Sequence, residues 1–269
     1  MAKGDSNRAR ATRRTKRPPA GSASGQPDTP ECLVGCSGWY YRHWKGAFYP
    51  PELASKQWFA HYQEHFPTVE LNAPFYHWPK PETVKRWARE ARSGFRYSVK
   101  VNRLITHQKR FQDTAGLVRD FYELLAPLGE ALGCVLFQMP PSWRHEPARL
   151  EAMLSQLDPA FRNVIEFRHP SWWDETVYAA FRQAGAIFCS VSAPGLPDEL
   201  VVTGPEVYLR MHGAARWYRH DYTEEELARW AARIRALSAR RVWVYFNNDW
   251  QASAVRNAAR LQELLSGKA

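Results

Sequence analysis

Short apolar runs alternate with amphipathic segments along almost the whole chain after residue 30. Apolar runs of this length, bounded by Gly, Pro or polar residues, are typical of buried β-strands. We expect strands at 32–36, 68–72, 95–101, 134–138, 164–165, 186–191, 207–211 and 242–246. The segments between them carry apolar residues at steps of three and four, as in Phe59, Tyr62 and Phe66, which predicts helices.

Local signals predict where several of these helices begin and end. Ser171 and Asp174 have the spacing of a capping box, so a helix is expected to start directly after residue 171, and Thr223 with Glu226 predicts another start. Gly94 is expected to close the second helix in a left-handed conformation. The loop after the sixth strand is rich in Pro and Gly and has little helical signal.

Eight strands alternating with about eight helices predict an α/β fold, specifically a (β/α)8 TIM-type barrel. The runs are apolar enough to be buried on both faces, as barrel strands are. An open, doubly wound sheet is the main alternative. It would usually have fewer strands and a Gly-rich phosphate loop after the first one, and residues 35–38 resemble such a loop only weakly.

Charge divides the chain into two parts. The formal net charge is +10 over 269 residues, and the first thirty residues contain seven Lys or Arg and two Asp, which gives 7 − 2 = +5. Residues 1–30 have almost no large apolar side chain, so we expect a disordered basic tail followed by one barrel domain at 31–269. Such a tail could tether nucleic acid electrostatically, or it could simply be solvated.

The cysteines and the hydropathy of the chain indicate the cellular compartment in which we expect the protein. The four cysteines form no CxxC pair, and each lies in an apolar run, which suits buried thiols in a reducing cytoplasm. The tail has no apolar core of a secretory signal, and no run of eighteen apolar residues predicts a membrane span. We therefore expect a cytoplasmic protein without a membrane partner.

Polar residues gather where the predicted strands end. In a barrel, the loops that follow the strands form one mouth, so these residues are expected to meet. Alternatively, pairs such as Glu166 with Arg210, or Glu70 with Arg168, only tie the rim together as ion pairs. The residues are Glu70, Asn72, Lys100, His107, Gln138, Glu166, Arg168, His169, Arg210, His212, Asn247, Asn248 and Asp249.

Most tryptophans follow the same pattern. Indoles around a barrel mouth could stack on sugar or nucleobase rings, and the alternative is that they pack the long loops onto the barrel. The eight that fall in or beside loops after strands are Trp39, Trp44, Trp78, Trp143, Trp172, Trp173, Trp217 and Trp250.

Three chemistries can be built from these residues. A divalent metal could be bound by Glu70, Glu166, His212 and Asp249, although no close HxH or HxxxE spacing supports it. Glu166 could instead act as general acid or base beside His212, while Arg168, Arg210 and Lys100 hold an anionic substrate. Glu70 and Glu166 could also form a glycosidase pair, although their placement after strands two and five is not the familiar one for barrel glycosidases.

Seven motifs resemble the domain-of-unknown-function 72 family, also called YecE-like. They are GCSGWYYRHWKGAFYP, VELNAPFYHWP, FRYSVKVNRLITH, LFQMPPSW, VIEFRHPSWW, YLRMHG with the later Tyr218 and Tyr222, and VYFNND, in order over residues 32–265. The resemblance implies a TIM-type barrel and no particular reaction. Its motifs coincide with Glu70, Asn72, Lys100, His107, Gln138, Glu166, Arg168, His212 and Asn248, and the basic tail lies outside them.

We expect an enzyme, with hydrolase and lyase as the candidate classes, that acts on a phosphate-bearing or nucleoside- or sugar-like substrate at the mouth. Glu166, Glu70 and His212 are the catalytic candidates, and a divalent metal is a possible cofactor. A non-catalytic nucleic-acid-binding protein, using the tail and the indoles, is the alternative. The substrate-binding candidates are Arg168, Arg210, Lys100, Asn72, His107, Gln138, Asn248, Trp39 and Trp172.

Overall fold

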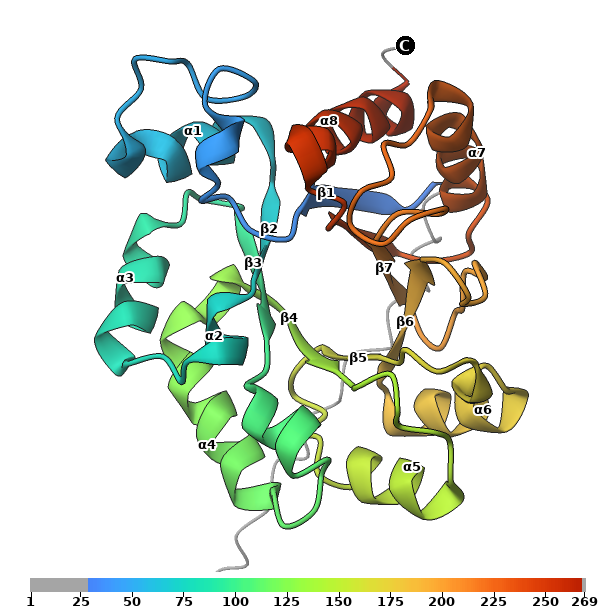
Figure 1. Ribbon diagram of the computed structural model, residues 1–269. Helices are drawn as coiled ribbons and strands as arrows, with labels where there is room; N and C mark the ends of the chain where they lie inside the picture. The colour runs from blue at the N-terminus through green and yellow to red at the C-terminus, as the bar shows by residue number, and fades with distance from the viewer. Residues whose placement is uncertain (1–28, 268–269) are drawn as a thin grey trace, which may run out of the picture.

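Eight parallel strands close into a barrel in which each strand pairs with the next and β8 pairs with β1 (Figure 1). The computed structural model describes residues 29–267. The TIM-type fold is confirmed, and every predicted strand is present. The strands are β1 Glu31–Cys36, β2 Thr68–Leu71, β3 Arg96–Lys100, β4 Leu132–Gln138, β5 Asn163–Glu166, β6 Ile187–Ser192, β7 Glu206–Met211 and β8 Arg241–Phe246.

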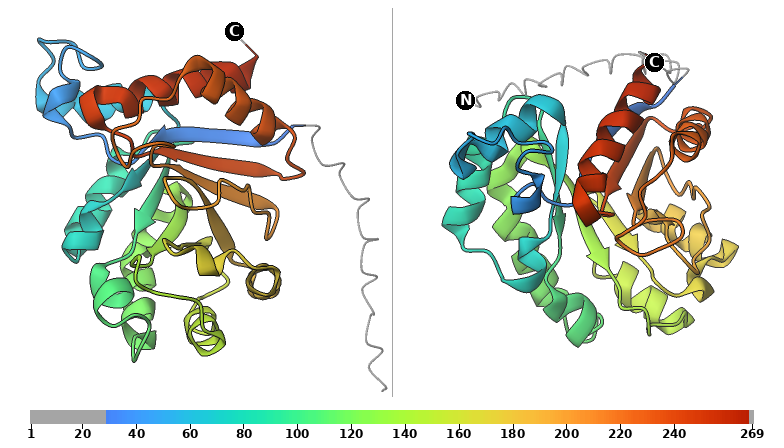
Figure 2. Two further views of the ribbon diagram at one scale, coloured as in Figure 1. Left: turned by 45° about the vertical axis from the view of Figure 1, so that its right-hand side comes forward. Right: turned by 45° about the horizontal axis from the view of Figure 1, so that its top comes forward.

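Helices surround the barrel in nearly every connection between strands, as the two views of Figure 2 show. The exception is the connection between β6 and β7, where residues 193–205 contain no helix, as the Pro-Gly composition predicts. The long helices are α1 Trp58–His65, α3 Pro81–Glu90, α4 Ala115–Leu125, α5 Pro147–Leu154, α6 Glu175–Ala184, α7 Glu224–Arg235 and α8 Ser253–Ser266, and a short α2, Ala73–Tyr76, follows β2.

The predicted start of α6 is wrong by one helical turn. Asp174 is the N-cap and accepts a hydrogen bond from the Thr176 amide at 2.8 Å, so the helix begins at Glu175. Ser171 lies in a separate 3-10 turn, where its hydroxyl contacts the His169 ring and the His145 amide. A side chain with these partners cannot also cap a helix, which is why the capping-box spacing misleads here.

Other terminal signals agree with the structure. Thr223 and Glu226 form the reciprocal capping box of α7. Gly94 has the expected positive φ of 83°, but α3 already ends at Glu90, so this glycine belongs to the turn before β3 rather than to the helix cap. Gly185 is the left-handed residue that ends α6.

Strand alternation separates two apolar regions. The larger one lies between the barrel and its helices, and includes Val99, Phe137 and Leu209. The smaller one contains the alternate residues of the same strands, such as Leu136 and Tyr208, and fills the barrel interior. Because Glu70, Lys100, Glu166 and Arg210 occupy this interior register near the ends of their strands, the sequence alternation alone carries them to the mouth.

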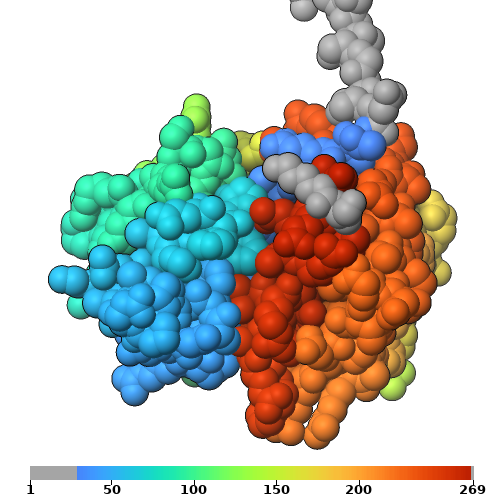
Figure 3. All heavy atoms as spheres, turned by 90° about the horizontal axis from the view of Figure 1, so that it is seen from above, coloured from blue at the N-terminus to red at the C-terminus, as the bar shows by residue number. Residues whose placement is uncertain are grey.

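The C-terminal helix completes the ring. In the space-filling view of Figure 3, α8 lies between the region of α1 and that of α7. Gln262 of α8 donates to the His65 carbonyl at the end of α1 at 3.2 Å, and Arg260 pairs with Glu224 of α7 at 2.6 Å. The predicted tail at 1–30 falls almost entirely outside the described residues. Among the helices that the structure describes, none has the length and apolar composition of a membrane span.

Candidate functional site

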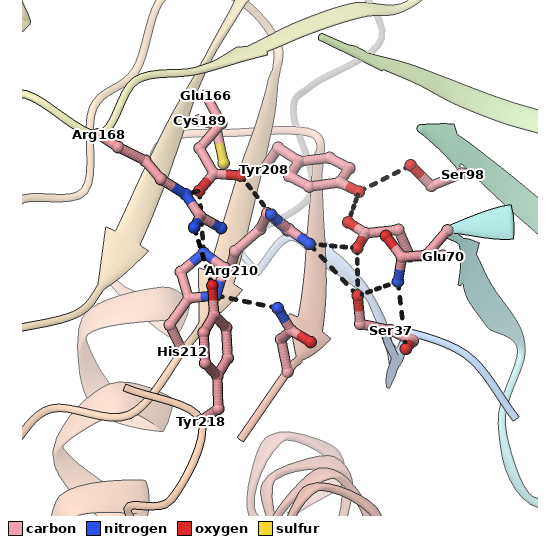
Figure 4. Close-up of polar contacts among 12 residues, drawn as sticks. Ser37, Glu70, Ser98, Glu166, Arg168, Cys189, Tyr208, Arg210, His212 and Tyr218 are labelled. Atoms are coloured by element: carbon pink, nitrogen blue, oxygen red, sulfur yellow. Dashed lines mark hydrogen bonds and ion pairs between the residues drawn. The ribbon is translucent and has the colours of Figure 1, made fainter. Parts of the chain in front are cut away.

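The guanidinium of Arg210 lies at the centre of a group of polar side chains at the carboxyl ends of the strands. Arg210 of β7 is only 1% exposed and lies between Glu166 of β5 and Glu70 of β2, with one terminal nitrogen directed at each carboxylate (Figure 4). The Arg210–Glu70 contact is 2.5 Å. Strands β2, β5 and β7 are not neighbours in the barrel, so this one side chain links distant parts of its wall.

Glu70 accepts hydrogen bonds from three side chains. Its oxygens accept from the Ser37 hydroxyl, from Arg210, and from the Tyr208 hydroxyl at 2.7 Å. The Asn72 amide donates to the Ser37 oxygen at 2.8 Å and so holds the serine in place. Burial raises the pKa of Glu70, but Arg210 and these hydrogen bonds outweigh burial, and the net pKa is lowered.

Glu166 has three partners of its own. It accepts from Arg210, from Arg168 at 2.9 Å, and from the His212 ring at 3.0 Å. Burial again opposes ionisation, but the two guanidiniums together hold the pKa of Glu166 well below its usual range. The residue is therefore a permanently ionised counter-charge for the two arginines.

His212 is neutral, and its tautomer is set by its neighbours. The Asn247 amide lies 3.2 Å from Nδ1 and donates to it, so Nε2 carries the proton that is donated to Glu166. Burial lowers the pKa of His212 to about 4, because Glu166, which favours the charged ring, is opposed by Arg210. A neutral, fully buried imidazole in this position orients the Glu166 carboxylate.

A pocket of about 700 Å³ opens directly above this network. Three arginines and one lysine line it, namely Arg103, Arg168, Arg210 and Lys100, and no Asp or Glu between residues 29 and 267 does. Glu70 and Glu166 are fully buried beneath, on the other side of the guanidiniums. The concave surface is thus strongly positive although the underlying network is balanced, which is the arrangement expected for an anion site.

The remaining pocket wall is formed by amides and aromatic rings. Asn72, Gln138 and Asn247 supply amide groups, and Tyr41, Phe75, Tyr76 and Tyr218 supply rings. The volume lies within the range of pockets for small molecules and cofactors.

Tyr218 is held in an unfavourable backbone conformation. Its φ is +62°, which is rare for a bulky residue, and its hydroxyl accepts from Arg168 at 2.8 Å. The loop that carries it leaves β7 at Gly213, where φ is +109° and a Cβ would lie 2.5 Å from the Arg216 carbonyl oxygen. Strain of this kind is found where a side chain must be placed for function.

Six of the predicted substrate-binding residues do meet in this pocket: Arg168, Arg210, Lys100, Asn72, His107 and Gln138. The three predicted catalytic residues, Glu166, Glu70 and His212, lie immediately behind it and are fully buried. Of the two ion pairs considered for the rim, Glu166 with Arg210 is present. Glu70 pairs with Arg210 rather than with Arg168.

The structure contradicts the placement of two tryptophans at the mouth. Trp172 is fully buried, stacks on Phe167 at 3.9 Å and donates its indole N–H to the Trp143 carbonyl at 2.7 Å. Trp39 packs on Phe59 at 4.6 Å. None of the residues lining the pocket in the described part of the chain is a tryptophan, and packing contacts account for the positions of Trp172 and Trp39.

Asn248 and Asp249 also lie outside the pocket. Asn248 is buried and donates to the His220 carbonyl at 2.8 Å and to Asn257 at 2.7 Å, so it joins the end of β8 to α8. Its neighbour Asn247 takes the position expected of it, because alternation along β8 turns residue 247 inward.

The predicted metal ligands are not assembled. Asp249 is bound to the Trp44 indole at 2.7 Å and to His43 at 2.9 Å, and the carboxylates of Glu70 and Glu166 are separated by Arg210. Between residues 29 and 267, only His61, Glu64 and His65 of α1 bring three potential ligand atoms within 4.8 Å of one another, and none of them lines the pocket.

Five residues that line the pocket are not among the predicted site residues: Tyr41, Phe75, Tyr76, Arg103 and Tyr218. A signal was available for each, because they follow β1, β2, β3 and β7 within the same loops as the predicted residues. Arg103 lies beyond the end of its strand, and tyrosine and phenylalanine are as common in packed loops as in binding sites, so neither signal is specific.

Comparison with known proteins assigns relatives but no reaction. The family model described as a protein of unknown function, DUF72, matches residues 33–269. The UPF0759 protein YunF of Bacillus subtilis (strain 168) is 26% identical over 268 residues, covering 86% of this chain and 94% of YunF. The UPF0759 protein YecE of Escherichia coli (strain K12) is 32% identical over 131 residues, which is 46% of this chain and 48% of YecE.

Solved structures agree with the fold. The crystal structure of a DUF72 family protein from Thermotoga maritima superposes with a TM-score of 0.80 at 28% identity, covering 88% of this chain and 99% of that one. A DUF72 family protein from Enterococcus faecalis superposes with a TM-score of 0.77 at 22% identity, covering 87% and 95%. At the latter identity, the likeness concerns the fold alone.

Proposed function

This chain belongs to the DUF72 family, whose function is unknown, and from the geometry of its barrel mouth we propose that it is an enzyme acting on a small phosphate-bearing substrate. One observation carries the proposal. Three arginines and one lysine line the pocket at the carboxyl ends of the strands, where barrel enzymes have their active sites, and among the described residues no carboxylate lines it.

Arginine suits phosphate, like carboxylate, better than lysine does, because its planar fork donates two parallel hydrogen bonds. Arg210 and Arg168 are already oriented by Glu166, so little conformational entropy is lost when a ligand binds. Arg103 is exposed at the rim and, in the part of the chain that the structure describes, has no ion-pair partner, so its charge is available.

The rest of the ligand would lie against the aromatic wall. Tyr76, which is exposed, presents a flat surface of the kind that stacks on a sugar or a nucleobase, and the Asn72 and Gln138 amides can bind hydroxyl groups. A sugar phosphate or a nucleotide-like compound matches this combination.

The roles that we assign to the buried residues differ from the catalytic roles predicted from their positions at the strand ends. Glu70, Glu166 and His212 are fully buried behind the arginines, so we assign them a positioning role. The proton-exchanging groups that line the pocket are Lys100 and His107.

Calorimetric titration with inorganic phosphate and with ribose 5-phosphate tests the proposal, using Arg103→Gln, Arg168→Gln and, as a control, Arg89→Gln on the exposed face of α3. A charge-assisted hydrogen bond is worth about 1.5–3 kcal/mol, so each pocket variant should bind roughly tenfold to a hundredfold more weakly. The control should bind normally. Affinity that is equal in all four proteins, or no binding of either compound, would overturn the proposal.

A further inference from the structure

Whereas the unpaired Arg103 is exposed, Lys100 is buried and, among the described residues, its side chain has no ion-pair partner. It is the last residue of β3, its side chain follows Ser98 into the barrel interior, and it is 8% exposed. Its Nζ lies 3.9 Å from the centre of the Phe75 ring. Arg168 and Arg210 each pair with a carboxylate, whereas the Lys100 side chain makes no hydrogen bond or ion pair with any residue between 29 and 267.

The surroundings of Lys100 disfavour its charged form. Burial is the largest cause, the guanidiniums of Arg210 and Arg168 act in the same direction, and Glu166 and Glu70 oppose them only in part, which lowers the pKa of Lys100 to about 7. The nearby His107 is neutral, because burial and Lys100 itself lower its pKa to about 4. Near neutral pH, a large fraction of Lys100 is therefore a free amine in contact with the pocket.

A free amine is a poor anion holder and a good nucleophile. The three arginines lining the pocket already provide charge and fixed donors for a phosphate. A lysine that were simply a fourth anion holder would gain from a carboxylate partner to keep it protonated, as Arg168 has in Glu166. The contact with the Phe75 face favours the ammonium, but burial and the two neighbouring guanidiniums outweigh it and favour the uncharged amine.

Building on the phosphate-bearing substrate proposed above, we propose that Lys100 is a nucleophile and that the substrate also carries an aldehyde or ketone. Nζ attacks the carbonyl carbon, a C–N bond forms, and the C–O bond breaks. The carbonyl oxygen leaves as water with one proton from the attacking amine and one from solvent, and a protonated imine joins Lys100 to the substrate. No oxidant or reductant is required, and the imine withdraws electrons from the neighbouring carbon.

Pyridoxal 5′-phosphate, a phosphate-bearing aldehyde, is a direct probe. The full-length protein is incubated with it near pH 7, reduced with borohydride and mapped by peptide mass spectrometry. We expect Lys100 to be labelled at least about tenfold faster than the exposed Lys56, Lys80 and Lys85, because a lysine in water has a pKa near 10.4 and is almost wholly protonated at this pH. Labelling of Lys100 should fall below pH 7.

Two variants and one competitor separate the possible origins of the label. Lys100→Met, which keeps the length and apolar stem of the side chain, should lose the fast-labelled site, and its circular dichroism should stay native. Lys85→Met, which removes a surface amine paired with Glu82 at 3.0 Å, should leave labelling of Lys100 unchanged. Inorganic phosphate should slow the reaction of Lys100, and phosphate-free pyridoxal should react more slowly.

The outcomes distinguish the two proposals. If calorimetry shows phosphate binding but Lys100 is labelled no faster than the exposed lysines, the assignment of Lys100 as a nucleophile is overturned. The proposed phosphate-binding enzyme is then still supported. If Lys100 reacts equally fast with pyridoxal and with its phosphate ester, and phosphate does not compete, the assignment of Lys100 as a nucleophile is supported. The proposed phosphate site is then overturned. If neither phosphate binding nor fast labelling occurs, both proposals are overturned.

Discussion

The carboxylate of Glu166 and the guanidinium of Arg210 form an ion pair inside the barrel in which neither side chain is more than 1% exposed. A pair that is removed from water gains little net stability from its formation, but it is expensive to break, because the surviving charge is left without a partner. The stability of the barrel and the shape of its pocket therefore depend on the same few residues.

Replacing Glu166 with Gln should destabilise the fold by about 3–5 kcal/mol, because Arg168 and Arg210 would then be left without this counter-charge. Urea unfolding followed by circular dichroism measures the change. The matched control is Glu175→Gln, which removes a carboxylate paired with Arg182 on the exposed surface and should cost less than about 1 kcal/mol. Similar losses in both variants would contradict the buried role of Glu166.

Arg210→Met should cost a similar amount, about 3–5 kcal/mol, and its cost should grow with pH. In the native protein, the pKa of Glu70 is lowered, so the carboxylate stabilises the fold above its unfolded pKa of about 4.3 and less so as the pH falls through its folded pKa. Without Arg210, burial would raise that pKa, and folding would be disfavoured increasingly above pH 4.3.

The unfolding free energies of the native protein and Arg210→Met, measured at pH 5 and pH 8, test this dependence. Arg260→Met, which removes a partner of Glu224 on the surface, is the control and should show no such trend. A difference between the native protein and Arg210→Met that stays constant across this range would refute the assignment.

The neutral state of His212 predicts a second pH effect. Its pKa is about 4 in the folded protein and about 6.5 when unfolded, so between these values the unfolded chain binds the extra proton. The unfolding free energy should therefore drop as the pH falls from 6.5 to 4, by up to about 1.4 kcal/mol per pH unit for this one group. His107 contributes in the same window.

His212→Gln keeps a donor for Glu166 and should reduce this slope, whereas the same substitution at the exposed His77 should not. Thermal or urea unfolding at half-unit pH steps measures both. If the slope is unchanged in His212→Gln, the ring is not a buried neutral group.

Trp172→Ala should lower stability by about 3–5 kcal/mol, because a fully buried indole stacked on Phe167 is lost. Phosphate affinity, measured under conditions where the variant is folded, should stay within twofold, since Trp172 does not line the pocket. A loss of affinity without a loss of stability would restore Trp172 to the ligand site.

Much of the fold follows from local pattern. Apolar runs and period-two alternation predict all eight strands and place Glu70, Lys100, Glu166 and Arg210 in the interior of the mouth. The predicted start of a helix is less secure where a tertiary contact competes with the local capping signal. At Ser171, the hydroxyl binds His169 and the His145 amide instead of capping a helix.

The site is predictable by position but not by role. Alternation identifies which side chains turn inward, yet it does not reveal that Arg210 stands between Glu70 and Glu166 and keeps them from a substrate or a metal. The position of Arg210 between the two carboxylates depends on how far each side chain extends into the barrel interior. Nor does sequence alone separate the packed Trp172 from the pocket-lining Tyr218, because both follow strand ends.

The link between β2 and β7 has a consequence for how the chain is made. Glu70 leaves the ribosome 140 residues before Arg210, the cation that neutralises it. Until β7 has been synthesised, a nascent barrel that closed over Glu70 would trap an uncompensated charge, so we expect Glu70 to stay in water until Arg210 is available. The wall of the barrel can therefore be completed only after most of the polypeptide has emerged, and a fragment that ends before β7 should not form the native interior.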